Sequence, residues 1–159
     1  MSEPRSTETR TSSPDITPLG QAALQQLALN VLAQYSGSAE GNEALAAAAR
    51  RAYEELAHVS TPLIGQVGVA ALIARASHLA QRDYPWLITL PESERADEPF
   101  AHVIVSLSRQ SPPDAAEGTA AVFAAFAGLL VTFIGEPLTA ALLRKAWPDA
   151  FADAETKET

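Results

Sequence analysis

Charged residues are absent from a stretch of 18 residues in the last third of the chain, from Gly118 to Gly135. On a helical projection, small residues follow one another at every fourth position on one side of this stretch, and bulky apolar residues fill the other side. The small side is formed by Ala120, Ala124, Gly128 and Thr132, and the bulky side by Val122, Phe126, Leu129 and Phe133. A helix that is uncharged all round is buried on most sides. We therefore expect residues 118–135 to form a central helix that other helices surround.

A membrane-spanning helix is the alternative interpretation of this stretch, because stripes of small residues are also common in membranes. A span needs about 20 strongly apolar residues, and this run is shorter and rich in alanine and glycine. Both flanking residues are glutamates, Glu117 and Glu136, so no basic cluster marks a cytoplasmic end. The pattern therefore favours a buried helix over a membrane span.

Apolar residues recur at helical spacing in further segments, and they predict helices over residues 18–35, 42–58, 62–83 and 136–147. We expect Thr17 and Asn42 to act as N-caps of the first two helices. The sequence Ser60-Thr61-Pro62 is expected to end the second helix and to begin the next one.

The segment over residues 100–108 is ambiguous. Its apolar residues Phe100, Val103, Ile104 and Leu107 fit a helix, whereas the run from Val103 to Val105 is β-branched and fits a strand. A single strand would have no partner in this chain, so we predict a helix.

The composition supports the same fold class, because alanine, the strongest helix former, accounts for 32 of the 159 residues. No repeat at a fixed period is expected. The sequence therefore predicts an all-α, single-domain bundle of about five to seven helices with a buried central helix and disordered termini. Its predicted parts are a disordered tail over residues 1–16, a helical bundle domain over residues 17–148 and an acidic, frayed tail over residues 149–159.

Charge and cysteine content narrow the function. The net charge is −8 and no basic face is evident, so we expect no binding of nucleic acid. The absence of cysteine excludes disulfides and thiolate metal sites. The N-terminus lacks the apolar core of a secretory signal, which indicates a cytoplasmic protein.

Candidate catalytic chemistry is sparse. The three histidines, His58, His78 and His102, lie 20 and 24 residues apart and show no metal-ligand spacing. Glycine-rich phosphate loops and the G-x-S-x-G nucleophile motif are absent from the sequence. We therefore predict no catalytic, cofactor-binding or metal-binding residues, no cofactor, and a protein that is not an enzyme.

One short segment, Ala-His-Val-Ser-Thr-Pro-Leu-Ile over residues 57–64, resembles the phospho-acceptor box of sensor histidine kinases. That family places an acceptor histidine on a helix, then an acidic residue, then Thr-Pro-Leu at a kink. Here Val59 stands in place of the acid, and the spacing from histidine to proline is one residue shorter. The resemblance implies that His58 accepts a phosphoryl group.

These observations predict a non-enzymatic helical interaction or regulatory domain that binds a protein partner or associates with itself through an apolar face. Three alternatives stay open. The first is a histidine phosphotransfer-type signalling domain with His58 as acceptor, and the second is a bundle that binds a small apolar ligand. The third is peripheral membrane attachment, which the sequence makes the least expected.

Overall fold

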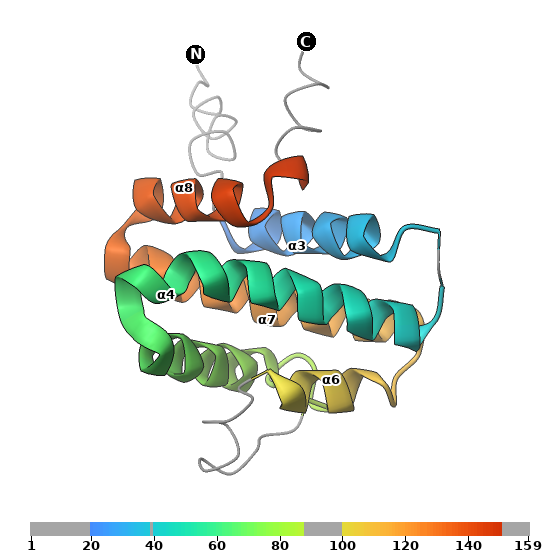
Figure 1. Ribbon diagram of the computed structural model, residues 1–159. Helices are drawn as coiled ribbons and strands as arrows, with labels where there is room; N and C mark the ends of the chain where they lie inside the picture. Colours follow the sequence, from blue (N-terminus) through green and yellow to red (C-terminus); the bar gives the residue numbers. More distant parts are fainter. Residues whose placement is uncertain (1–19, 39, 88–99, 151–159) are drawn as a thin grey trace, which may run out of the picture.

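The computed structural model describes residues 20–38, 40–87 and 100–150, and these residues form an all-α bundle without any strand among them (Figure 1). Its helical elements are α3 (Gln21–Ser36), α4 (Asn42–Ala80), α6 (Ala101–Leu107), α7 (Pro112–Ile134) and α8 (Glu136–Ala146). The predicted all-α fold is confirmed, and the ambiguous segment after Phe100 is helical. The predicted tail over residues 1–16 lies outside the described residues, as does most of the tail from residue 149.

Two long parallel helices form the centre of the bundle. One is α7, and the other is the first part of α4, residues 42–64, here called the N-limb. Both run towards the same end of the molecule, where the chain turns back at Gly65 and Gly135 (Figure 1). The second part of α4, residues 66–80, here called the C-limb, returns on one side of this pair, and α8 returns on the other.

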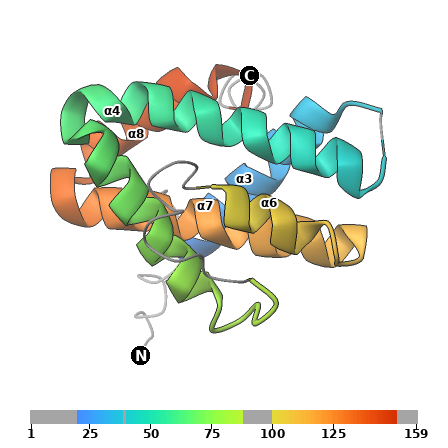
Figure 2. The same ribbon diagram turned by 60° about the horizontal axis from the view of Figure 1, so that its bottom comes forward.

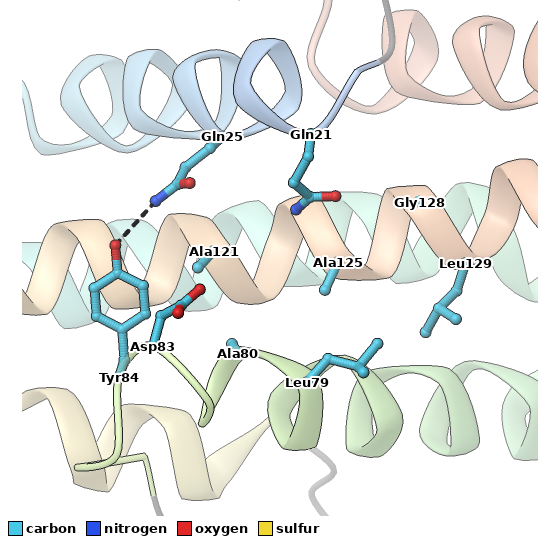
Figure 3. Close-up of a pocket in the computed structure, with 10 residues that line it drawn as sticks. All are labelled: Gln21, Gln25, Leu79, Ala80, Asp83, Tyr84, Ala121, Ala125, Gly128 and Leu129. Atoms are coloured by element: carbon cyan, nitrogen blue, oxygen red, sulfur yellow. Dashed lines mark hydrogen bonds between the residues drawn. The ribbon is translucent and has the colours of Figure 1, made fainter.

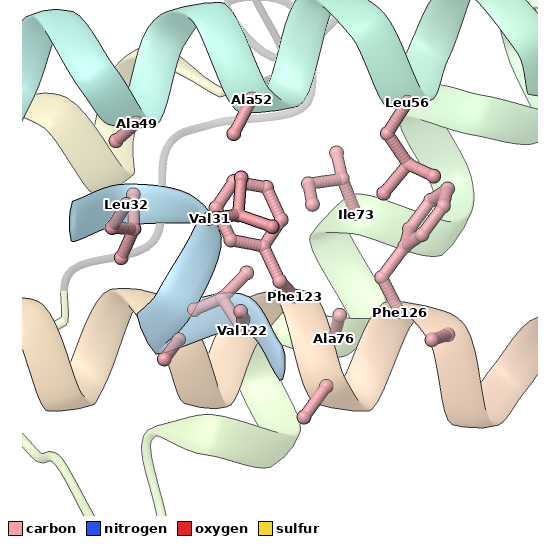
Figure 4. Close-up of a cluster of buried hydrophobic side chains, with 14 of the residues drawn as sticks. Val31, Leu32, Ala49, Ala52, Leu56, Ile73, Ala76, Val122, Phe123 and Phe126 are labelled. Atoms are coloured by element: carbon pink, nitrogen blue, oxygen red, sulfur yellow. The ribbon is translucent and has the colours of Figure 1, made fainter. Parts of the chain in front are cut away.

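The predicted central helix is confirmed. The rings of Phe123 and Phe126 are buried against side chains of α3 and of both limbs of α4 (Figure 4). The helix begins at Pro112, six residues before the uncharged stretch, because prolines fit the first turn of a helix, where their missing N–H has no partner to lose.

Phe133 does not face the core, and this part of the sequence prediction was wrong. Its side chain is exposed because α7 ends at Ile134, where the bundle itself ends, so no neighbouring helix reaches across the last turn. Thr132, on the small-residue side, is exposed for the same reason.

The break in α4 also differs from the prediction. The backbone stays helical through Ser60-Thr61-Pro62 and leaves the helical region at Gly65, with φ 80° and ψ 163°. Pro62 removes only one backbone hydrogen bond, whereas the chain reversal needs a conformation that is essentially restricted to glycine. The break therefore lies three residues after the proline, at Gly65.

Asn42 is the first helical residue of α4 and not its N-cap, which is Gly41. Its side-chain amide donates instead to carbonyl oxygens at the end of α6, those of Leu107 at 3.2 Å, Ser108 at 3.4 Å and Gln110. The last carbonyls of a helix have no partner within that helix, so Asn42 ties the end of α6 to the start of α4.

Candidate functional site

Most of the exposed large hydrophobic side chains gather at the end of the bundle where the chain turns. Leu63 and Val67 flank Gly65, and their side chains are 49% and 84% exposed. Phe133 and Leu138 flank Gly135, and their side chains are 67% and 43% exposed. We call these four residues the apolar end. Elsewhere in the described residues, only Val105 on α6 combines a large hydrophobic side chain with comparable exposure.

The backbone explains why these side chains reach water. Gly65 and Gly135 take up nearly the same conformation, with φ 80° and 92° and ψ 163° and 158°. Each turn begins directly after the last residue of a long helix, at the end of the bundle (Figure 1), and its flanking side chains are exposed there. Apolar side chains that gather in this way on one surface usually mark an interaction site.

The apolar end is almost uncharged, although the chain as a whole carries a net charge of −8. Over residues 60–68 and 131–138, which form the two turns, Glu136 is the one ionisable side chain. It lies in the first turn of α8, where the helix dipole favours a negative charge. The other charged side chains of the described residues therefore lie outside the two turns.

The three histidines do not converge. His58 and His78 are exposed on the N-limb and the C-limb, whereas His102 on α6 is buried. The described residues contain no group of three or more side chains that could hold a metal ion. The histidines therefore give no sign of a shared metal site in this part of the chain.

His102 makes one contact that the sequence did not predict. Its Nε2 lies 2.7 Å from the hydroxyl oxygen of Ser77, and both side chains are buried. The Ser77 hydroxyl donates its proton to the carbonyl oxygen of Ile73 at 2.9 Å, so His102 acts as the donor in this pair. A nucleophilic serine would need to donate to the histidine instead. This arrangement fixes α6 to the C-limb, and it is not an activated nucleophile.

A pocket of about 410 Å³ lies between α3, α7 and the end of the C-limb (Figure 3). Ala121, Ala125 and Gly128 of α7 form its small-residue wall. The opposite rim is polar, because Gln25 donates to the hydroxyl of Tyr84 at 3.3 Å. The volume lies near the lower end of the range of small-molecule sites. The sequence-based hypothesis of an apolar ligand therefore has a space to occupy, because Leu79 and Ala80 of the C-limb add a second apolar wall.

Among the residues that the structure describes, two helices are long and apolar enough to cross a membrane by length and composition alone, α4 and α7. In the most apolar 18-residue window of each, half of the residues of α7 and 28% of those of α4 are buried inside the bundle. Core helices of soluble proteins satisfy the same criteria, so length and composition do not decide between the two settings.

Comparison of the chain with models of protein families, with curated proteins and with solved structures finds no match.

Proposed function

We propose that this protein is a non-enzymatic interaction domain that works in the cytoplasm and buries its apolar end against another protein. The observation that carries the proposal is the exposure of Leu63, Val67, Phe133 and Leu138 around the two turns. Burial of one such side chain is worth about 1.5–3 kcal/mol. Because these side chains are 43–84% exposed, a partner that covers all four would gain about two to three times that amount before the costs of association.

The charge around the apolar end favours a protein partner over a lipid surface. The cytoplasmic face of a membrane is negative and attracts lysine and arginine. The turns contain no basic residue, and Glu136 lies among them. An anionic bilayer would therefore repel this end, whereas an uncharged apolar protein surface would not.

The test compares variants of the apolar end with a matched control. Phe133→Asp and Val67→Asp place a charge on the apolar end, and Val105→Asp places the same charge on the exposed side chain of α6. Each protein is immobilised and incubated with lysate, and the captured proteins are identified by mass spectrometry. We expect a partner captured by wild type and by Val105→Asp to be lost from both variants of the apolar end.

Circular dichroism would first establish that all variants fold, which their exposed positions lead us to expect. Capture that is equal for all four proteins, or absent from a wild type that also stays monomeric in sedimentation velocity, would contradict the proposal. Flotation of wild type with neutral liposomes, abolished by Phe133→Asp, would assign the apolar end to lipid and would also contradict it.

A second candidate function, histidine phosphotransfer, draws on the exposure of His58 and on the kink that follows Pro62. A phospho-acceptor imidazole must be accessible, and His58 meets this condition. Incubation with acetyl phosphate tests it: acid-labile phosphate should form on wild type and on His78→Gln but not on His58→Gln. Absence of such phosphate from wild type would exclude this candidate and leave the interaction function standing.

A further inference from the structure

Two segments that lie 70 residues apart have related sequences. Residues 63–76 read LIGQVGVAALIARA, and residues 133–146 read FIGEPLTAALLRKA. Identical residues occur at six of the fourteen aligned positions: Ile64 and Ile134, Gly65 and Gly135, Ala70 and Ala140, Ala71 and Ala141, Leu72 and Leu142, Ala76 and Ala146. The expectation that the chain contains no repeat was therefore wrong.

The backbone repeats with the same offset. The N-limb starts at Asn42 and α7 starts at Pro112, and both helices continue to the isoleucine that precedes the turn glycine. α7 has 23 residues, the same number as the N-limb. The two glycines then share their positive-φ conformation, and a second helix returns along the bundle after each of them.

Burial follows the same correspondence. Every buried residue in the range 42–76 has a buried counterpart 70 positions later in the range 112–146. These pairs are Leu45 and Ala115, Ala48 and Gly118, Ala49 and Thr119, Ala52 and Val122, Leu56 and Phe126, Ser60 and Leu130, Val69 and Thr139, Leu72 and Leu142, Ile73 and Leu143, Ala76 and Ala146. The two halves of the chain therefore build one core from equivalent positions.

The arrangement in space is that of an approximate two-fold axis parallel to the N-limb and α7. A half-turn about this axis exchanges the N-limb with α7, and the C-limb with α8 (Figures 1 and 2). It also exchanges α3 with the shorter α6, which lie on opposite sides of the central pair. α7 has more buried positions than the N-limb. The reason is that α3, which packs against α7, has 16 residues, whereas the equivalent helix α6 has only 7.

The axis leaves the molecule at the apolar end. One half of this surface comes from the first repeat, Leu63 and Val67, and the other half from the second repeat, Phe133 and Leu138. The surface thus consists of two similar half-sites on either side of an axis. Symmetric surfaces of this kind suit a symmetric association, in which each molecule offers the same patch.

We infer that the chain is an internal duplication, and that the occupant of its apolar end is a second copy of the chain, joined end to end along the approximate axis. This inference rests on the proposed interaction function. Two copies with a net charge of −8 each repel one another, although most of that charge lies outside the described residues. The nearly uncharged apolar end is where two copies can approach without this cost.

The available area supports a weak dimer. Side chains with these exposed fractions present roughly 500 Å² per molecule, so two joined ends bury about 1,000 Å², the lower bound for a specific interface. Two molecules joined end to end can adopt two orientations that differ by a half-turn about the approximate axis. Because the half-sites are similar, both orientations place apolar side chains against apolar side chains. We therefore expect a reversible dimer with a dissociation constant in the micromolar range.

The experiment uses the natural absence of cysteine from the chain. Gln66→Cys introduces one thiol into the exposed first turn, and Arg109→Cys introduces one on an exposed residue after α6, at the opposite end of the bundle. Sedimentation velocity measures the dimer of wild type over a range of concentrations. Mild oxidation then shows which thiol forms a disulfide between two molecules.

We expect wild type to dimerise, Gln66→Cys to crosslink rapidly and Arg109→Cys to remain uncrosslinked. Phe133→Asp should weaken the dimer about tenfold or more, and Val105→Asp should leave it unchanged. A wild type that stays monomeric at high concentration overturns the second copy as occupant, and the capture experiment then decides the proposed function separately. A dimer that crosslinks through Arg109→Cys and persists in Phe133→Asp overturns it as well.

Discussion

The ring of Phe100 lies parallel to the ring of Tyr53, with 4.7 Å between the centroids and 4° between the planes. Phe100 also stacks on Phe123, at 5.4 Å, and Phe123 in turn meets Trp147 edge to face at 5.7 Å. Tyr53 and Phe123 occupy equivalent positions in the two repeats. One phenylalanine from the start of α6 therefore joins the two central helices near the approximate axis.

Removal of this ring should weaken the whole bundle. We expect Phe100→Ala to lower the free energy of unfolding by about 3–5 kcal/mol, the usual cost for a buried phenylalanine. Urea denaturation followed by circular dichroism measures the change. Phe133→Ala, which removes an equal ring from an exposed site, should change stability by less than about 0.5 kcal/mol. Similar losses in the two variants would show that the aromatic stack adds nothing to stability.

Tyr53 should make the protein sensitive to alkali. Burial raises the pKa of Tyr53 from 10 to about 12, so the folded state favours the neutral phenol. Its contribution to stability is complete below pH 10 and is lost as the pH rises from 10 to 12. Tyr53→Phe, which copies the residue at the equivalent position 123, should reduce this dependence.

Unfolding by urea at pH 9 and at pH 11.5 measures the effect in both proteins. Some loss of stability will remain in Tyr53→Phe, because burial and the nearby charge of Glu55 also raise the pKa of Tyr35. Equal losses of stability between the two pH values in wild type and Tyr53→Phe would contradict the prediction.

Two glycines of α7 should respond in opposite ways to alanine. A Cβ atom at Gly118 would lie 2.2 Å from the Cζ2 atom of Trp86, which rests directly on the backbone there. Gly118→Ala must therefore displace the indole and should destabilise the fold by about 1–3 kcal/mol.

A Cβ atom at Gly128 meets only the side-chain oxygen of Gln21, at 3.5 Å. Gly128→Ala should stabilise the helix by up to about 1 kcal/mol. Thermal unfolding of the two variants measures the difference, and a shift of the same sign in both would refute it.

Thr139 offers a stabilising substitution that the other repeat already contains. Its hydroxyl is fully buried and lacks a hydrogen-bond partner, and the equivalent residue is Val69. Thr139→Val keeps the shape and removes the unpaired polar group, so we expect a gain of about 1 kcal/mol in unfolding free energy. Ser77→Ala is the control, because it removes a buried hydroxyl that is hydrogen-bonded to Ile73 and His102 and should lower stability. A loss of stability in Thr139→Val would count against this reasoning.

The helices themselves were predictable, because local periodicity and the prolines determine where most of them form. The position of the break in α4 was not. Pro62 is a strong local signal, but the reversal depends on which residue can adopt a positive φ, and that residue is Gly65. Asn42 resembles an N-cap in sequence, and its amide is used by a different helix that only the tertiary structure brings near.

The candidate site could not be predicted, because exposure depends on where neighbouring helices end. Phe126 and Phe133 have the same place in the apolar pattern of α7, yet one is fully buried and the other is exposed. The repeat is inconspicuous in the sequence because the identical residues are concentrated in a segment of fourteen. In the two long helices, equivalent positions are buried but hold different residues, such as Leu56 and Phe126.

The two tryptophans connect the two halves of the chain. Trp147, after the second repeat, donates to the carbonyl oxygen of Ala52 in the first, at 3.2 Å, and Trp86, after the first repeat, rests on Gly118 in the second. A tryptophan from each half thus packs against the central helix of the other half. Two polypeptides produced by cutting between residues 88 and 99 should therefore reassemble when mixed, and neither should hold its tertiary structure when kept alone.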